Sequence, residues 1–101
     1  MIKYHKTLRD QNLESLVISG HALFADFGND IVCAAVSTAV IMTINAIESL
    51  GERENIKVII EEGYVEINVL KSTKIVDGLL NNLTYSLNDL NLQFPKNIKE
   101  E

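Results

Sequence analysis

The stretch IVCAAVSTAVIMTINAIESL, residues 31–50, decides how the rest of this chain must fold. It predicts one long helix, which Gly51 closes. Apolar side chains occur around most of the helix circumference, and a single sheet could not cover all of them. We therefore expect the helix to be covered on several sides, in part by a second helix and in part by another copy of the chain in a homodimer.

The same stretch has to be considered as a membrane span, because residues 31–47 carry no charge. This run is slightly short for a bilayer, contains Ser, Thr and Asn, and is flanked by Asp30 and Glu48 instead of lysine or arginine. A buried core helix is the better interpretation. The polar start of the chain, MIKYHKTLRDQN, is unlike a secretory signal, so we expect a cytoplasmic protein with no membrane partner.

Two strand pairs and a second helix surround the central helix in the sequence. Residues 1–8 and 13–19 predict a hairpin around the turn RDQN, and residues 56–62 and 64–70 predict another around Gly63. Residues 74–93 predict the second helix, which Pro95 ends. Its expected apolar stripe consists of Ile75, Leu79, Leu83, Leu87, Leu90 and Phe94. This order predicts an α+β fold, a two-layer sandwich with an antiparallel four-stranded sheet and both helices packed on one face.

Composition limits the protein to a few classes. The 101 residues are enough for one domain, residues 1–101, with a core that needs neither metal nor disulfide. The single cysteine excludes an internal disulfide and a cysteine-rich zinc site, and we expect no metal ion or other cofactor. The formal net charge of -5 argues against direct nucleic-acid binding and is compatible with a basic protein partner.

The segment GHALFADFGNDIVC, which starts at Gly20, brings His21 and Cys33 close to the start of the central helix. Asp30 has the character of an N-cap, which would place Cys33 in the first helical turn. The helix dipole there favours the thiolate, and the backbone N–H groups could stabilise an oxyanion. His21, held by Gly20 at the end of a strand, could pair with the thiolate and later protonate a leaving amine. Ser37, one turn after Cys33, could donate a hydrogen bond to the sulfur or position a polar substrate group.

The residues alone leave a structural interpretation open. Cys33 could be a small buried hydrophobe beside Ala34 and Ala35, and His21 could be an ordinary loop residue. One histidine and one cysteine at this spacing are a weak indication of catalysis. The sequence offers no clear third member of a triad, because a capping role for Asp30 would occupy the same carboxylate.

The motif pair GHA, residues 20–22, and NDIVCAAVS, residues 29–37, resembles the paired signature of the bacterial ribosomal-processing cysteine protease family, often called Prp. Chain length, element order and the closing segment QFPKNIK also fit this family. The resemblance implies a homodimer in which Cys33 is the nucleophile and His21 its base. Gly20, Asp30 and Ser37 match the accompanying positions of the signature.

The resemblance also implies an activity and a substrate. Members of the family are cysteine endopeptidases that remove a short N-terminal extension from a large-subunit ribosomal protein, number twenty-seven, and cleave it after an aromatic pair. Such processing supports ribosome assembly, and the very basic ribosomal substrate agrees with the acidic charge of this chain.

Two alternative functions and one separate question about a segment stay open. The chain could be a catalytically silent, ribosome-associated binding module on the same fold. It could instead be a single-thiol redox sensor, in which peroxide oxidises Cys33 and no peptide is cleaved. The segment LNLQFP, residues 90–95, resembles the extension that the family cuts and could mimic the product, although the helical pattern already explains its apolar residues.

Overall fold

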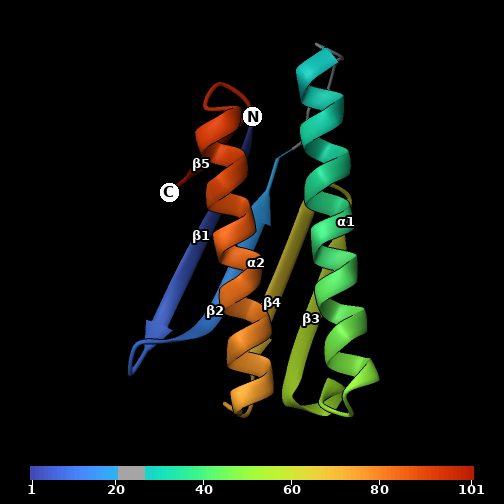
Figure 1. The fold of residues 1–101 in the computed structure, drawn as a ribbon, viewed down its shortest axis with the longest axis vertical. Helices are drawn as coiled ribbons and strands as arrows, with labels where there is room; N and C mark the ends of the chain where they lie inside the picture. Colours follow the sequence, from blue (N-terminus) through green and yellow to red (C-terminus); the bar gives the residue numbers. More distant parts are fainter. Residues whose placement is uncertain (21–26) are drawn as a thin grey trace.

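In the part of the chain that the structure describes, the two long helices lie on one face of a single sheet (Figure 1). The computed structural model describes residues 1–20 and 27–101, with the side chains of the first helix described from Ile31 onward. The elements are β1 (Ile2–Arg9), β2 (Asn12–Ser19), α1 (Phe27–Ser49), a short 3-10 helix (Arg53–Asn55), β3 (Ile56–Glu61), β4 (Tyr64–Val69), α2 (Lys74–Gln93) and β5 (Ile98–Glu100). The α+β class, the two hairpins and the placement of the helices are therefore as the sequence predicts.

The strands follow the order β3-β4-β2-β1-β5 across the sheet. β1 pairs with β2, β2 with β4, and β4 with β3, all antiparallel. The β1–β2 turn is made by Asp10 and Gln11, which both have positive φ angles, 51° and 70°. That backbone conformation matches the right-handed twist of a hairpin, and Asp is one of the residues that tolerate it.

The sheet differs from the prediction in its fifth strand. Residues 98–100 pair with β1 in parallel, so the sheet is mixed and five-stranded where the sequence predicts four antiparallel strands. The Ile98 side chain is fully buried, at 0% exposure. The backbone N–H of Ile2 donates to the Asn97 carbonyl at 2.9 Å, and that of Glu101 donates to the Tyr4 carbonyl at 2.8 Å. Three residues are too few to show a strand period, which is why the sequence pattern misses β5.

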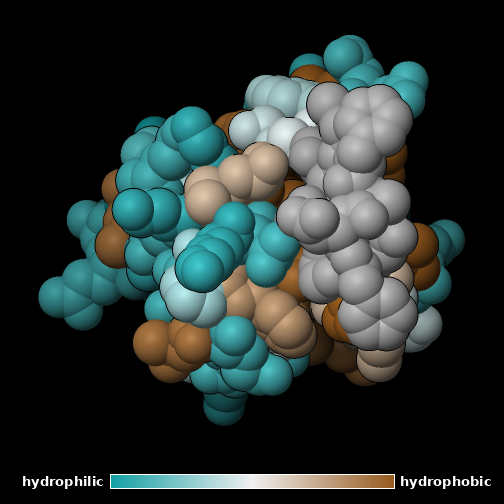
Figure 2. All heavy atoms as spheres, turned by 90° about the horizontal axis from the view of Figure 1, so that it is seen from above, coloured by the Kyte–Doolittle hydropathy of each residue, from teal (hydrophilic) through white to brown (hydrophobic). Residues whose placement is uncertain are grey.

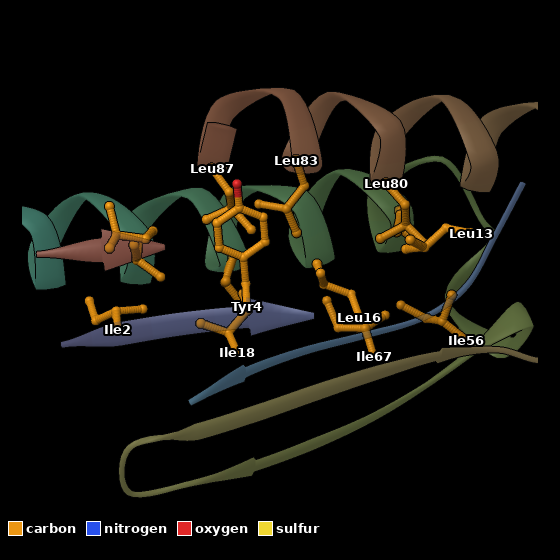
Figure 3. Close-up of a cluster of buried hydrophobic side chains, with 14 of the residues drawn as sticks. Ile2, Tyr4, Leu13, Leu16, Ile18, Ile56, Ile67, Leu80, Leu83 and Leu87 are labelled. Carbon is orange, nitrogen blue, oxygen red and sulfur yellow. The ribbon is translucent and has the colours of Figure 1, made fainter. Parts of the chain in front are cut away.

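One hydrophobic core fills the space between the sheet and the helices. Side chains of the strands point toward the helix layer, where leucines of α2 meet them (Figure 3). The buried residues of α2 are Val76, Leu80, Leu83, Thr84 and Leu87. The predicted stripe is therefore correct at Leu83 and Leu87 but wrong at Ile75, which is 39% exposed. Helix α2 begins after Thr73, whose hydroxyl oxygen accepts a hydrogen bond from the Val76 backbone N–H at 3.1 Å.

Helix α1 packs against this core along one stripe and leaves other apolar residues uncovered. Its buried residues are Val32, Val36, Val40, Thr43 and Ile47. Its exposed large hydrophobic residues are Ile31, Ile41 and Met42, and Leu50 follows them just beyond the helix. Ile31–Ser49 is long and apolar enough to cross a membrane. The core helix of a soluble protein also meets this criterion of length and composition. In the structure, α1 packs against α2 and contributes its buried residues to the shared hydrophobic core, although only 28% of this apolar window is buried.

The buried position of Ile98 generates a stability prediction. Ile98→Ala removes a fully buried side chain, and we expect the free energy of unfolding to fall by about 2–4 kcal/mol. Lys99→Ala, at the exposed neighbouring position, should change it by less than about 0.5 kcal/mol. Urea denaturation of both variants provides the measurement. If Ile98→Ala lowered the free energy of unfolding by as little as Lys99→Ala, the Ile98 side chain would add nothing to the stability of the core.

Candidate functional site

An open hollow lies between the N-terminal half of α1, the end of β2 and the β3–β4 hairpin. Its volume is about 220 Å³, and Cys33 lines it together with Gly20, Ser37 and Tyr64. Apolar surface is visible at this end of the molecule between hydrophilic regions (Figure 2). The structure therefore brings together Gly20, Cys33 and Ser37, three residues that the sequence singles out. Gly20 directly follows β2, whereas Cys33 and Ser37 belong to α1.

Packing of α1 explains why the thiol faces this hollow. Val32 and Val36 are buried in the core, at 0% and 6% exposure. Each residue turns about 100° further around a helix, so burial of Val32 places Cys33 at the edge of the buried stripe. Cys33 is accordingly half-buried and packs against the core, while Ser37, four residues later, is exposed on the same side of the helix.

The start of α1 differs from the prediction and changes the role of Asp30. The helix begins at Phe27, so Asp30 is its fourth residue, and the N-cap assignment is wrong. Cys33 is then the seventh helical residue and lies beyond the first turn. The dipole effect and the unpaired N–H groups are confined to that first turn. The expectation that the helix start activates Cys33 and stabilises an oxyanion through its own turn is therefore wrong as well.

The backbone conformation and the close packing at position 20 require glycine. It follows β2 with a φ of 97°, and its backbone N–H donates to the Gly63 carbonyl at 2.9 Å. A Cβ atom at this position would lie 2.3 Å from the carbonyl oxygen of Met1. Only glycine lets the end of β2 pass this close to the start of β1 while it also forms the wall of the hollow.

Sequence reasoning did not identify the residues that β3 and β4 contribute to the hollow. Tyr64 forms a hydrogen bond to Glu66, and Asn68 donates to the same carboxylate at 2.7 Å. The hydrogen bond to Glu66 raises the pKa of Tyr64, and the bonds from Asn68 and Tyr64 lower the pKa of Glu66. The spacing of two residues places these three side chains on one face of β4. Only Tyr64 of the three lines the hollow, since Glu66 and Asn68 lie on the face of β4 opposite the buried Ile67. No motif marks Tyr64, because it reaches the hollow only through the order of the strands.

The hollow continues as an apolar groove along α1. Its lining residues are Val36, Ser37, Val40, Ile41, Ile60 and Val65. Four of them, Val36, Ser37, Ile60 and Val65, also line the hollow at Cys33. We call the surface lined by all six residues the α1–β3 groove.

His21 lies outside the described residues, as does the following segment to residue 26.

The segment 90–95 ends helix α2, where the Phe94 backbone N–H donates to the Leu90 carbonyl at 2.8 Å. It is not among the described residues that line the hollow, so the product-mimic idea is wrong for this conformation. Within residues 1–20 and 31–101, no group of three or more His, Cys, Asp or Glu side chains could hold a metal ion.

A cysteine that lines an open hollow on a two-layer α+β fold defines a candidate thiol enzyme. The family model "Cysteine protease Prp" matches residues 1–99. This chain belongs to the cysteine protease Prp family, as its motif pair indicates.

Relatives with names or structures agree with this assignment. The ribosomal processing cysteine protease Prp of Bacillus subtilis (strain 168) is 39% identical over 54 residues, which are 54% of this chain and 48% of that protein. The match thus spans about half the length of that curated relative.

Solved structures share the fold over the whole chain. The essential ribosomal processing protease Prp from S. aureus, in complex with a covalently linked product peptide, has a TM-score of 0.86 and 24% identity, covering 100% of this chain and 98% of that one. The same protease with a substrate peptide has a TM-score of 0.85 and 23% identity, with the same coverage. SMU.848 from Streptococcus mutans has a TM-score of 0.81 and 28% identity, covering 100% of this chain and 92% of that one.

The close approach at Gly20 generates a second prediction. Gly20→Ala should destabilise the fold more than Gly51→Ala, although both glycines have positive φ angles, 97° and 78°. A Cβ at Gly51 meets nothing within 4 Å, so we expect only the conformational cost of about 1–2 kcal/mol. Gly20→Ala adds the overlap with the Met1 carbonyl, about 1–3 kcal/mol more. Urea denaturation of the two variants measures the difference, and equal costs would contradict the close packing.

Proposed function

We propose that this chain is a cysteine endopeptidase in which Cys33 is the nucleophile and His21 the general base. Its expected substrate is the N-terminal extension of large-subunit ribosomal protein number twenty-seven, cleaved after an aromatic pair in the cytoplasm. The observation that carries the proposal is the position of the single cysteine on an open hollow, in a chain of the cysteine protease Prp family. Gly20, the residue directly before His21, forms part of the same wall.

The proposed reaction has two steps. The thiolate of Cys33 attacks the scissile carbonyl carbon, and the C–N bond breaks as His21 gives a proton to the leaving amine. Water then attacks the thioester carbon, His21 accepts the water proton, and the C–S bond breaks to release the acid and the thiolate. A Cys–His pair can perform this chemistry without a strongly oriented triad, because a thiol is a much better nucleophile than a hydroxyl at neutral pH.

Two neighbours of Cys33 have proposed supporting roles. Ser37 is exposed and lines the hollow, so its hydroxyl can donate a hydrogen bond to a polar group of the substrate. Asp30 precedes Cys33 by three residues in the same helix, which makes it a candidate to orient His21. This orienting role replaces the capping role that the helix boundary excludes.

Substitution of the pair tests the proposal. Cys33→Ala should fold, because alanine suits a helix, and should abolish cleavage of a peptide that contains the aromatic pair. His21→Ala should reduce the rate by at least about two orders of magnitude, the lower range for a positioned acid–base group. The measurement is mass spectrometry of the peptide products.

The same assay separates the alternatives. Cleavage by Cys33→Ala at the wild-type rate would refute the assignment. Peroxide oxidation of Cys33 with no peptide cleavage by the wild type would favour the redox sensor. Peptide binding without cleavage or thiol reactivity would favour the silent binding module.

We also propose that the protein is a homodimer that covers the exposed apolar residues at Ile31, Met42 and Leu50. Met42 is 66% exposed on α1, a large value for an apolar side chain in a core helix. Sedimentation at micromolar concentration should give twice the chain mass of 11.3 kDa.

A matched pair of variants tests the location of this interface. Met42→Gln should weaken the dimer, by about 1 kcal/mol for each of the two symmetric contacts. Leu92→Gln, at a 74% exposed position on α2, should leave it unchanged. A wild-type monomer at this concentration would refute the dimer.

A further inference from the structure

The α1–β3 groove has a chemical character that the catalytic pair does not explain. Val36, Val40 and Val65 form its floor and walls, while Ile41 and Ile60 are 55% and 63% exposed at its rim. Apart from Ser37, every described residue that lines it is aliphatic. Large aliphatic side chains left this open to solvent in a contiguous strip are typical of a surface that another apolar group covers.

The groove begins at the candidate nucleophile. Ser37 and Ile41 follow Cys33 by four and eight residues on α1, so all three lie along one side of the helix. Eight residues of helix span about 12 Å, the length of three to four residues of extended peptide. A chain whose reactive carbonyl reaches Cys33 would therefore place its neighbouring side chains in the groove.

The adjoining strand edge favours an extended occupant. β3 is the last strand of the sheet on this side and pairs only with β4 among the described residues. Its outer edge carries backbone groups that can pair with an added strand, as in peptide recognition by sheet edges. Every second side chain of such a strand would face the same side as Ile60, which is the side of the groove.

Charge at the rim adds a second preference. Glu61 lines the hollow next to Cys33, and the exposed Glu62 follows it in the β3–β4 turn. Among the described side chains, no ion pair engages either carboxylate. Two unpaired carboxylates at the Cys33 end of an apolar groove complement a peptide that carries a cation near its apolar residues.

We infer that the α1–β3 groove is the specificity site for the substrate, where Ile41 and Ile60 hold a large apolar side chain within about four residues of the scissile bond. The occupant is an extended peptide segment that is apolar where it lies along α1 and basic beside Glu61 and Glu62. This inference rests on the proposed function, since it assigns the groove to the peptide that Cys33 attacks.

Thiol alkylation tests the groove without requiring proteolysis. The probes are iodoacetamide and N-(2-phenylethyl)iodoacetamide, and mass spectrometry gives the rate constant of Cys33 modification by each. The ratio of the two constants cancels the reactivity of the thiol and reports how well the groove accepts a phenyl ring. We expect a ratio of about ten for the wild type, from partial burial of the ring.

Two rim variants and one control define the outcome. Ile41→Gln and Ile60→Thr should each lower the ratio by about threefold or more, because both make the rim polar while they keep helix or strand propensity. Met42→Gln should leave the ratio unchanged, since Met42 is turned about 100° away from Ile41 around α1 and does not line the groove. Circular dichroism confirms that each variant folds.

A peptide-binding measurement tests which ligand the groove accepts. The Cys33→Ala variant should bind a peptide of the ribosomal extension at least about tenfold more tightly than the same peptide with its aromatic pair replaced by alanine. Glu61→Gln combined with Glu62→Gln should reduce the salt dependence of that binding.

Several results would overturn the inference. A ratio near one for the wild type, equal loss in Met42→Gln, or equal binding of both peptides would show that the groove does not select apolar side chains. If Ile41→Gln dissociates the dimer and leaves the ratio intact, the groove is a contact between subunits. If the ratio behaves as expected but no peptide is cleaved, the proposed protease function fails while the apolar site stands.

Discussion

The rotation of α1 about its own axis is the constraint on which the site depends. Burial of Val32, Val36 and Val40 against the sheet permits one orientation of the helix, since a rotation by one residue would bring Cys33 into the core. The same orientation directs Cys33 and Ser37 toward the β3–β4 hairpin. Core packing and the candidate chemistry therefore depend on a single set of contacts, and a repacked core would move the thiol.

Most of the fold follows from hydrophobic pattern, because both hairpins and α2 show clear periodicity, and α1 is a long uncharged apolar run that Gly51 closes. The start of α1 does not, since Gly28 and Asn29 are poor helix formers whose local preference is for turns. β5 is too short for a period and depends on pairing with a strand at the other end of the sequence. The motif pair identifies Cys33 and Ser37, whereas Ile60 and Tyr64 join the hollow only through the order of the strands.

The position of Cys33 in the second turn changes how its reactivity can arise. A cysteine at the first turn would gain from the helix dipole, but that effect falls off before the seventh helical residue. In the proposed mechanism, activation of the thiol therefore depends on His21 and not on the start of the helix. For the same reason, stabilisation of an oxyanion needs donors outside the turn that carries Cys33, because its own N–H lies beyond the four that a helix start leaves unpaired.

The pairing of β5 with β1 has a consequence for the order of folding. His5 on β1 contacts the Glu101 carbonyl across 96 residues of sequence, whereas β1 and β2 are joined by a tight turn. During synthesis the hairpin can form early, but the outer edge of β1 and the side of Ile2 that meets Ile98 stay open until the last strand has emerged. Contacts of such long range carry a large loop-closure entropy and slow folding. Docking of β5 is thus expected to be a late event, and until residues 98–100 have been synthesised the edge of β1 that pairs with them stays exposed.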